Sequence, residues 1–314
     1  MPDSNLTMLK KSNKPALLIL ILVLLLLLLI GFIYIKNPAV IDIVTEATAT
    51  SSAKVTTSDN KITVGTFNLN VLTTKKAGKP EIMGVLSKIV RNFDIIALQE
   101  IQDQSQTALP MLKDAVNSIG SSQYEYVVGR TTNIEQFAYF YNTQTIQLMG
   151  NPYVYPNSNG IFQKEPYVAQ FKEKINNFDF VLITTHTNPD RAKSEIKNLP
   201  MVVEDARSRY QGEDEFIVLG DLNADCTHFK VNSSSPLRSS DYFWLINNSV
   251  DTTTKSNDCA YDRIIMTNPD MSDYMGNSGV FRFDKLYNLS YKRTIAVSDH
   301  YPVYASFWSN RDTD

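Results

Sequence analysis

The stretch FIVLGDLNADC (residues 216–226) joins a short apolar run to a polar segment in which Asp221 and Asn223 come first. Similar apolar runs rich in β-branched residues recur along the chain and alternate with helical patterns. This alternation is typical of buried strands that are covered by helices. Because the apolar runs outnumber the helical patterns, we expect an α/β fold in which two packed central β-sheets are flanked by helices.

The expected strands span most of the chain after residue 61. They are residues 62–69, 94–99, 124–128, 137–141, 167–171, 178–185, 215–219, 260–266 and 301–307. Apolar residues with helical spacing occur at 81–92, after Pro80 at an expected helix start, and at 191–210. Pro200 should kink or divide the second helix, because proline lacks an N–H and clashes with the preceding turn.

Polar residues recur where an apolar run ends or is about to begin. Strand ends in α/β folds are common places for functional sites, because the rigid sheet positions the groups and loops leave room for a ligand. Any one of these residues could instead serve a turn or a helix cap. The residues at such positions are Asn68, Glu100, His186, Asp221, Asn223, Asp262, Asp299 and His300.

The histidines strengthen the functional interpretation. The chain has three, of which His186 follows an apolar run and His300 adjoins an aspartate, whereas His228 has no such setting and is expected at the surface. Two histidines among carboxylates and asparagines indicate acid–base chemistry near a hard metal ion. Mg²⁺ fits this oxygen-rich set better than zinc, because Cys226 and Cys259 show no zinc-ligand spacing.

The reaction class follows from the same residues. Mg²⁺ with histidines, carboxylates and amides suits hydrolysis of a phosphoester. No GxxxxGK[ST] or GxGxxG loop occurs, which disfavours nucleotide-driven phosphoryl transfer. The two cysteines by themselves allow either one bridge or two free thiols.

The charge is unevenly distributed along the 314 residues. The chain has 30 Lys and Arg against 33 Asp and Glu, a net charge of −3, which argues against a polybasic binder. Residues 1–36 contain four lysines and one aspartate, a charge of +3, which leaves −6 on residues 37–314. The hydrophobic fraction of 43% fits a globular domain with a sizeable core.

The N-terminal region contains an uncharged apolar run long enough to span a bilayer. Three lysines precede it, so we expect a cytoplasmic N-terminus, an extracytoplasmic remainder and contact with the lipid bilayer. A cleaved signal peptide, which would make the protein secreted, and a buried core helix are the alternatives. The expected organisation is a cytoplasmic N-terminus at 1–15, a transmembrane anchor at 16–36, a Thr/Ser/Ala-rich linker at 37–61 and a catalytic domain at 62–310.

Several segments together resemble the endonuclease/exonuclease/phosphatase superfamily and, within it, secreted deoxyribonuclease I. They occur in the family's order and cover nearly all of residues 62–308. The resemblance implies a four-layered α/β sandwich with the active site at one edge. The matching segments include TFNLNV (66–71), FDIIALQEIQD (93–103), THTNPD (185–190), GDLNADC (220–226), CAYDRI (259–264) and SDHYPV (298–303).

The resemblance also implies roles for individual residues. Glu100 and Asn68 match metal-site positions, with Asp299 close by, and the metal would be Mg²⁺, with Mn²⁺ or Ca²⁺ as supporting ions. His300, held by Asp262, would be the general base, and His186, oriented by Glu135, would be the general acid. The remaining matches are Asp221 and Asn223 for orienting the phosphate, Lys164 near the phosphate, and Cys226 with Cys259 as a structural disulfide.

The departures from the family pattern affect substrate binding. Gln102 and Asn133 stand where deoxyribonuclease I has an arginine and a tyrosine that contact DNA, which should weaken the grip on duplex DNA. Of the family's calcium loops, Asp251 and Thr253 echo one site, with Lys255 intruding. The sequence therefore predicts a nuclease that binds DNA transiently. A phosphodiesterase or phosphatase acting on phospholipids or phosphoinositides, and a non-catalytic binding module, are the alternatives.

Overall fold

The computed structural model describes residues 60–131, 134–176, 178–230, 232–267 and 272–312. The expected cytoplasmic segment at 1–15, the anchor at 16–36, nearly all of the linker at 37–61 and Asn133 lie outside the described residues. Within the described ranges, no helix is both long and apolar enough to cross a membrane.

Two six-stranded β-sheets form the centre of the domain. The strands of the first sheet, in spatial order, are β11 (Tyr274–Val280), β12 (Val303–Trp308), β1 (Lys61–Leu72), β2 (Ile95–Ile101), β4 (Gln136–Asn142) and β3 (Tyr124–Arg130). Those of the second sheet are β5 (Ile146–Val154), β6 (Tyr167–Glu173), β7 (Asp179–His186), β8 (Phe216–Asp221), β10 (Asp262–Met266) and β9 (Phe243–Trp244). Both sheets are mixed, because β1 pairs with β2, and β7 with β8, in parallel, whereas the other pairs are antiparallel.

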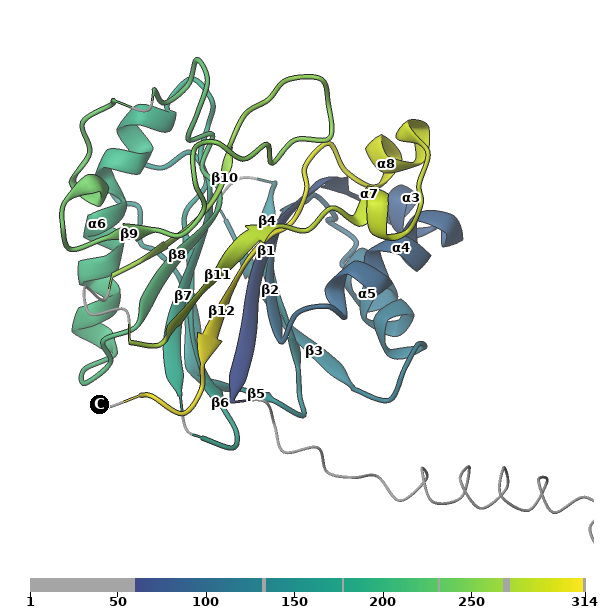
Figure 1. The fold of residues 1–314 in the computed structure, drawn as a ribbon, viewed down its shortest axis with the longest axis horizontal. Helices are drawn as coiled ribbons and strands as arrows, with labels where there is room; N and C mark the ends of the chain where they lie inside the picture. Colours follow the sequence, from purple (N-terminus) through teal and green to yellow (C-terminus); the bar gives the residue numbers. More distant parts are fainter. Residues whose placement is uncertain (1–59, 132–133, 177, 231, 268–271, 313–314) are drawn as a thin grey trace, which may run out of the picture. The chain divides into compact units, whose positions relative to one another are not determined.

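Helices cover the outer faces of both sheets, as Figure 1 shows. The second sheet packs against α6 (Ala192–Arg209) through Ile196, Leu199 and Val203. On the side of the first sheet lie α3 (Thr74–Ala77), α4 (Pro80–Val90), α5 (Ala108–Asn117), α7 (Phe283–Leu286) and α8 (Tyr291–Val297). The expected α/β sandwich of two mixed sheets flanked by helices is confirmed.

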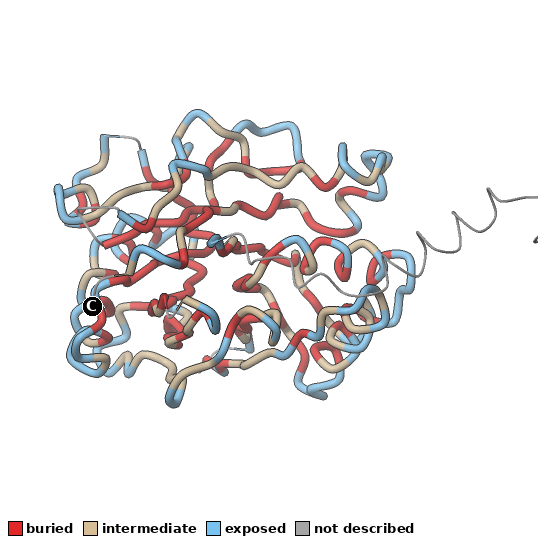
Figure 2. The backbone as a smooth tube through the Cα atoms, turned by 60° about the horizontal axis from the view of Figure 1, so that its bottom comes forward, coloured by how far each residue is buried: buried red, intermediate tan, exposed pale blue. Residues whose placement is uncertain are grey.

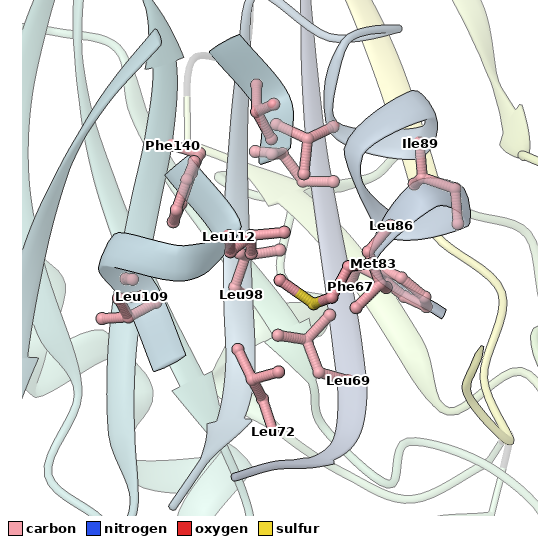
Figure 3. Close-up of a cluster of buried hydrophobic side chains, with 14 of the residues drawn as sticks. Phe67, Leu69, Leu72, Met83, Leu86, Ile89, Leu98, Leu109, Leu112 and Phe140 are labelled. Atoms are coloured by element: carbon pink, nitrogen blue, oxygen red, sulfur yellow. The ribbon is translucent and has the colours of Figure 1, made fainter. Parts of the chain in front are cut away.

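Three buried apolar clusters fill the spaces between these layers. Phe67, Leu86 and Leu98 belong to the cluster between the first sheet and its helices, which Figure 3 shows. The cluster between the sheets includes Val64 of β1 and Leu182 of β7. Figure 2 shows that the buried backbone is concentrated in the interior strands, while exposed segments lie at the periphery. The two sheets therefore share a core that holds their strand ends in fixed positions.

Of the two expected effects of Pro200, division of the helix is wrong, because α6 continues through it from Ala192 to Arg209, and a kink stays a prediction. A proline in a helix removes one backbone hydrogen bond. The buried residues Leu199 and Val202, on either side of it, keep both halves against the sheet. Packing of the apolar face thus outweighs the local cost.

Candidate active site

Three neighbouring strands of the second sheet bring catalytic candidates together at one edge. His186 ends β7 and Asp221 ends β8, and the two residues are paired in the parallel register. Asp262 begins the antiparallel strand β10 and lies opposite Asp221. The carboxyl ends of β7 and β8 thus meet the start of β10, which is why three residues far apart in sequence share one site.

The first sheet contributes two further residues at irregular points in its strands. The pairing of β1 with β2 shifts register between Asn68 and Leu72, and that of β2 with β4 shifts between Leu98 and Ile101. Glu100 lies within the second irregularity and has a φ of 58°. Bulges often occur beside active sites, where they redirect a side chain.

Backbone strain accompanies the irregularity in β1. Asn70 and Val71 have φ angles of 46° and 61°. A positive φ is uncommon for a β-branched residue such as valine and costs roughly 1–3 kcal/mol. The amide of Val71 donates a hydrogen bond to Oε2 of Glu100 at 2.9 Å, which helps hold this conformation.

Asn68 connects carboxylates from both sheets. Its Nδ2 donates hydrogen bonds to Oε1 of Glu100 at 2.9 Å and to Oδ2 of Asp221 at 3.0 Å. Its backbone carbonyl accepts a hydrogen bond of 2.7 Å from Oγ of Ser298, and that same Oγ accepts the amide hydrogen of His300 at 3.0 Å. The side chain of Asn68 thus fixes the spacing of two acidic groups, and its backbone carbonyl contributes through Ser298 to the position of His300.

His300 and Asp262 form a buried hydrogen-bonded pair. Nδ1 of His300 lies 2.8 Å from Oδ2 of Asp262, and Nε2 lies 3.6 Å from Oδ2 of Asp221. Burial opposes protonation of the ring, but the negative charges of Asp262 and Asp221 outweigh it and raise the pKa of His300 to about 10. Burial conversely raises the pKa of Asp262 above its usual value, although His300 opposes that shift.

His186 and Glu135 form a second pair of the same kind. Nδ1 of His186 lies 2.8 Å from Oε1 of Glu135, which precedes β4, and that same Oε1 accepts the amide hydrogen of Glu100 at 3.1 Å. Burial opposes protonation of His186, but the Glu135 carboxylate outweighs it and raises the pKa of the ring. Burial would raise the pKa of Glu135, yet the charge and hydrogen bond of His186 lower it.

Asp221 lies between the two histidines. Nε2 of His186 and Nε2 of His300 are each 3.6 Å from Oδ2 of Asp221. Burial would raise the pKa of this carboxyl, but the charges of both rings and hydrogen bonds from Asn223 and Asn68 lower it. Asp221 therefore remains ionised between two ring nitrogens that face the same point.

Asn223 is held by the turn that follows β8. It has a φ of 46°, its amide donates a hydrogen bond to Oδ1 of Asp221 at 3.0 Å, and its Nδ2 donates one to the carbonyl of Thr187 at 3.0 Å. Gly220, just before Asp221, has a φ of 144°, and a Cβ there would collide with the carbonyl of Thr185. The end of β8 thus needs glycine where this strand approaches Thr185 of β7 closely.

Three lysines lie among these acids. Nζ of Lys164 is 3.4 Å from Oε2 of Glu135, and Nζ of Lys255 is 2.6 Å from Oδ2 of Asp299. Lys76 donates hydrogen bonds to the backbone carbonyls of Leu69 and Asn70. Burial lowers the pKa of Lys76 to about 8, although Asp299 and Glu100 oppose that shift.

The charges of the site do not balance without a further cation or protonated histidines. The described residues bring five carboxylates to this edge and three ammonium groups, which leaves two net negative charges when both imidazoles are neutral. Two imidazolium protons or one divalent cation would balance this excess. The carboxylates are those of Glu100, Glu135, Asp221, Asp262 and Asp299, and the ammonium groups are those of Lys76, Lys164 and Lys255.

Two sets of residues could hold a divalent cation. Asp221, Asp262 and His300 each offer a ligand atom, and these atoms lie within 4.8 Å of one another. The set expected from the sequence is Glu100, Asn68 and Asp299. Oδ1 of Asp299 lies 4.0 Å from Nε2 of His300. We favour the expected set, because it offers oxygen ligands alone, and Mg²⁺ prefers oxygen ligands to imidazole. The donor chemistry therefore fits a hard cation at the Glu100 side of the site.

The remaining sequence predictions concern the edge of the site. Cys226 and Cys259 form a disulfide, as the family resemblance implied, which ties the loop after β8 to the residues before β10. His228 is half-buried, and its ring centroid lies 5.8 Å from that of Tyr261, so it is not fully at the surface as expected. Gln102 is half-buried just after β2.

The family resemblance placed Lys164 near the phosphate, but sequence reasoning missed the positions of Lys76 and Lys255 in the site. Lys76 follows the first strand in the segment LTTKK (72–76), and this closeness to Asn68 was the available signal. Lys255 was noted only as an intruder in a calcium-loop pattern. Its partner Asp299 is 44 residues away, so their ion pair could not be inferred from spacing.

Comparison with known proteins identifies one family and several relatives named deoxyribonuclease. The sequence pattern described as "Endonuclease/Exonuclease/phosphatase family" matches residues 65–300. Deoxyribonuclease gamma of Mus musculus is 35% identical over 261 residues, which cover 78% of this chain and 84% of that protein. Deoxyribonuclease-1-like 1 of Cricetulus griseus is 35% identical over 248 residues, which cover 76% and 81%.

Solved structures share the fold at lower identity. The structure of D. rerio TDP2 complexed with a single strand DNA product has a TM-score of 0.55 and 16% identity, and covers 79% of this chain and 99% of that one. A family protein from Bacteroides thetaiotaomicron has a TM-score of 0.55 and 17% identity, with coverage of 79% and 94%. At this identity the likeness concerns the fold alone.

Proposed function

This chain belongs to the endonuclease/exonuclease/phosphatase family, and from that premise we propose that it is a metal-dependent nuclease that cleaves DNA. It is a hydrolase that acts on phosphodiester bonds, similar to deoxyribonuclease I. The choice of DNA as substrate is supported by relatives named deoxyribonuclease that cover most of the chain.

One observation carries the proposal: two histidine–carboxylate pairs face each other across Asp221. Each ring has its Nδ1 at 2.8 Å from a carboxylate and its Nε2 at 3.6 Å from Oδ2 of Asp221. Hydrolysis of a phosphodiester needs one group that accepts a proton from water and another that gives a proton to the leaving oxygen. Two imidazoles held in this way suit those two tasks.

His300 is the proposed general base. Oδ2 of Asp262 holds the Nδ1 hydrogen, so a neutral His300 presents its Nε2 lone pair to a water molecule. The same carboxylate stabilises the imidazolium that forms when the ring takes the water's proton. Because its raised pKa favours the protonated ring, added positive charge in the site is needed to make His300 a base at neutral pH.

His186 is the proposed general acid. Its raised pKa favours the protonated ring, and Glu135 fixes the orientation of that ring. The proton on Nε2 is then available to the leaving oxygen of the cleaved bond. Asp221 and Asn223 are proposed to orient the phosphate between the two rings, with Lys164 at its side.

Glu100, Asn68 and Asp299 are the residues proposed to hold Mg²⁺, for which Mn²⁺ or Ca²⁺ could substitute or assist. A bound divalent cation would neutralise charge on the phosphate and supply the positive charge that lowers the pKa of His300. Oε1 of Glu100 accepts a hydrogen bond of 2.9 Å from Nδ2 of Asn68, so the two side chains lie side by side in the site.

Weak, transient binding of DNA is part of this proposal. The net charge of −3 gives no polybasic surface, so affinity must come from the site itself. Lys164 and a bound cation would supply local positive charge there. A non-catalytic binding module is disfavoured, because it would have no need for two oriented histidine–carboxylate pairs.

We also propose that the domain works outside the cytoplasm, held by the apolar segment at 16–36. The disulfide between Cys226 and Cys259 supports this location, because such bonds persist in oxidising compartments. If that segment is cleaved, the same enzyme would be secreted. Fractionation of cells that express the full chain, with protease added to intact cells, would test the orientation.

The substrate is tested with the full chain purified in detergent. In the presence of Mg²⁺, the protein is incubated either with supercoiled plasmid or with vesicles of phospholipid and phosphoinositide. We expect nicking of the plasmid and no release of phosphate or head group from the lipids. Hydrolysis of lipids without nicking of the plasmid would overturn the nuclease proposal and favour the phosphodiesterase alternative.

A further inference from the structure

Lys255 is placed beside the site by backbone pairing. The neighbouring residues Thr253 and Thr254 are bound to the segment that carries the general base: Thr253 forms a bridge with His300, and the amide of Thr254 donates a hydrogen bond to the carbonyl of Asp299 at 2.8 Å. Oγ1 of Thr254 donates another to the carbonyl of Ser298 at 2.9 Å. The ion pair between Lys255 and Asp299 is therefore a consequence of how two loops are joined.

The two lysines that interact with Asp299 differ in their freedom to move. Lys76 and Lys255 both interact electrostatically with Asp299 and Glu100. Lys76 is half-buried and its ammonium is bound by two backbone carbonyls, whereas the side chain of Lys255 is 57% exposed. Lys255 can therefore leave its partner for solvent, and Lys76 is held in place.

We propose that Lys255 is an internal counter-ion that competes with the divalent cation for Asp299, so that the cation binds as the Lys255 ammonium moves away. This inference rests on the proposed metal-dependent function. An ammonium 2.6 Å from Oδ2 of Asp299 occupies the place that a cation would need on that oxygen. The competition lowers the affinity of the site for divalent cations, and this sets how much of the cation the enzyme needs.

The expected size of the effect follows from the exposure of Lys255, since the Asp299 side chain is only 19% exposed. An ion pair that is open to solvent at one end contributes little to stability, so its loss to a competing cation costs little. Removing the ammonium should therefore tighten cation binding by about two- to fivefold at low ionic strength. The gain should shrink at high salt, because salt screens an exposed charge.

The test is a titration of the full chain with Mn²⁺ in which the free ion is measured by electron paramagnetic resonance, with no substrate present. Lys255→Met removes the charge, Lys255→Arg keeps it, and Glu100→Gln weakens the proposed cation site. Lys113→Met is the matched control, because Lys113 is also a partly exposed lysine in an ion pair, 3.1 Å from Glu125. Thermal unfolding of each variant checks that the fold is retained.

We expect tighter Mn²⁺ binding in Lys255→Met alone, with wild-type affinity in Lys255→Arg and Lys113→Met. Equal affinity in Lys255→Met and the wild type, with weaker binding in Glu100→Gln, would overturn the counter-ion proposal and leave the metal site in place. If the wild type and Glu100→Gln bind Mn²⁺ equally weakly, the proposed metal site itself is wrong, and the counter-ion proposal falls with it.

Discussion

Nδ2 of Asn68 donates a hydrogen bond of 3.0 Å to Oδ2 of Asp221, joining β1 of one sheet to β8 of the other across 153 residues of sequence. The same Nδ2 also binds Glu100. One amide group thus separates two carboxylates that would otherwise repel each other. The position of the site depends on this contact as well as on the shared core of the two sheets.

Replacing Asn68 by alanine should lower the free energy of unfolding by roughly 1–3 kcal/mol, because two carboxylates lose their buried donor. Denaturant unfolding measures this change. Asn198→Ala is the control, because Asn198 is half-buried on α6 and its Nδ2 donates a hydrogen bond to a local carbonyl, that of Ser194. Equal stability of Asn68→Ala and the wild type would contradict the structural role of Asn68.

The three histidines should differ sharply in their effect on activity. We expect His186→Ala and His300→Ala each to reduce the rate of plasmid nicking by at least about 10²-fold, because each removes a proposed proton-transfer group. His228→Ala should change the rate little, since His228 contacts Tyr261 outside the two pairs. Circular dichroism controls for folding, and full activity in either of the first two variants would refute its assigned role.

The stability of the metal-free protein should depend on pH through His300. Its pKa is raised in the folded state to about 10, from an ordinary value of 6.5. The stabilisation is therefore fully present below pH 6.5 and is lost as the pH rises through 10. Unfolding of the wild type and His300→Gln in EDTA at pH 6 and at pH 9.5 measures this: the advantage of the wild type should shrink at the higher pH. A constant or growing advantage would contradict the raised pKa.

Two glycines should respond in opposite ways to replacement by alanine. Gly220→Ala should destabilise the protein by more than about 2 kcal/mol, because φ is 144° and the added Cβ meets the carbonyl of Thr185. Gly84→Ala should stabilise it by about 0.5–1 kcal/mol, because Gly84 lies in α4 with open space around it. Thermal denaturation compares the two, and a tolerated Gly220→Ala would show that the contact between β8 and β7 can relax.

The sequence allowed all interior strands and the edge strand β3 to be predicted, but not the other three edge strands. Each expected strand overlaps an observed one, whereas β5, β9 and β11 were missed, and all three lie at sheet edges. The strand β5 contains Gly150 and Pro152, and β11 contains Gly276 and Gly279. An edge strand tolerates such residues, because half of its backbone needs no partner, so its pattern is weak.

The site could be predicted in its members but not in its connections. The positions of Asn68, Glu100, His186 and Asp221 at strand ends were enough to mark them as candidates. The pairs of His186 with Glu135 and His300 with Asp262 came from the family resemblance, because partners 51 and 38 residues apart leave no local signal. The bulge geometry at Glu100 depends on tertiary register and has no signature in the sequence.

The dependence of DNA cleavage on a divalent cation is the most direct test of the account. The rate of nicking of supercoiled plasmid by the full chain would be measured in EDTA and again after an excess of Mg²⁺ is added, with His300→Ala purified in parallel to detect contaminating nuclease. We predict that the wild type loses at least about 10²-fold of its rate in EDTA and recovers it with Mg²⁺. Nicking by the wild type that persists unchanged in EDTA would contradict the account. Nicking by His300→Ala at the wild-type rate would also contradict it.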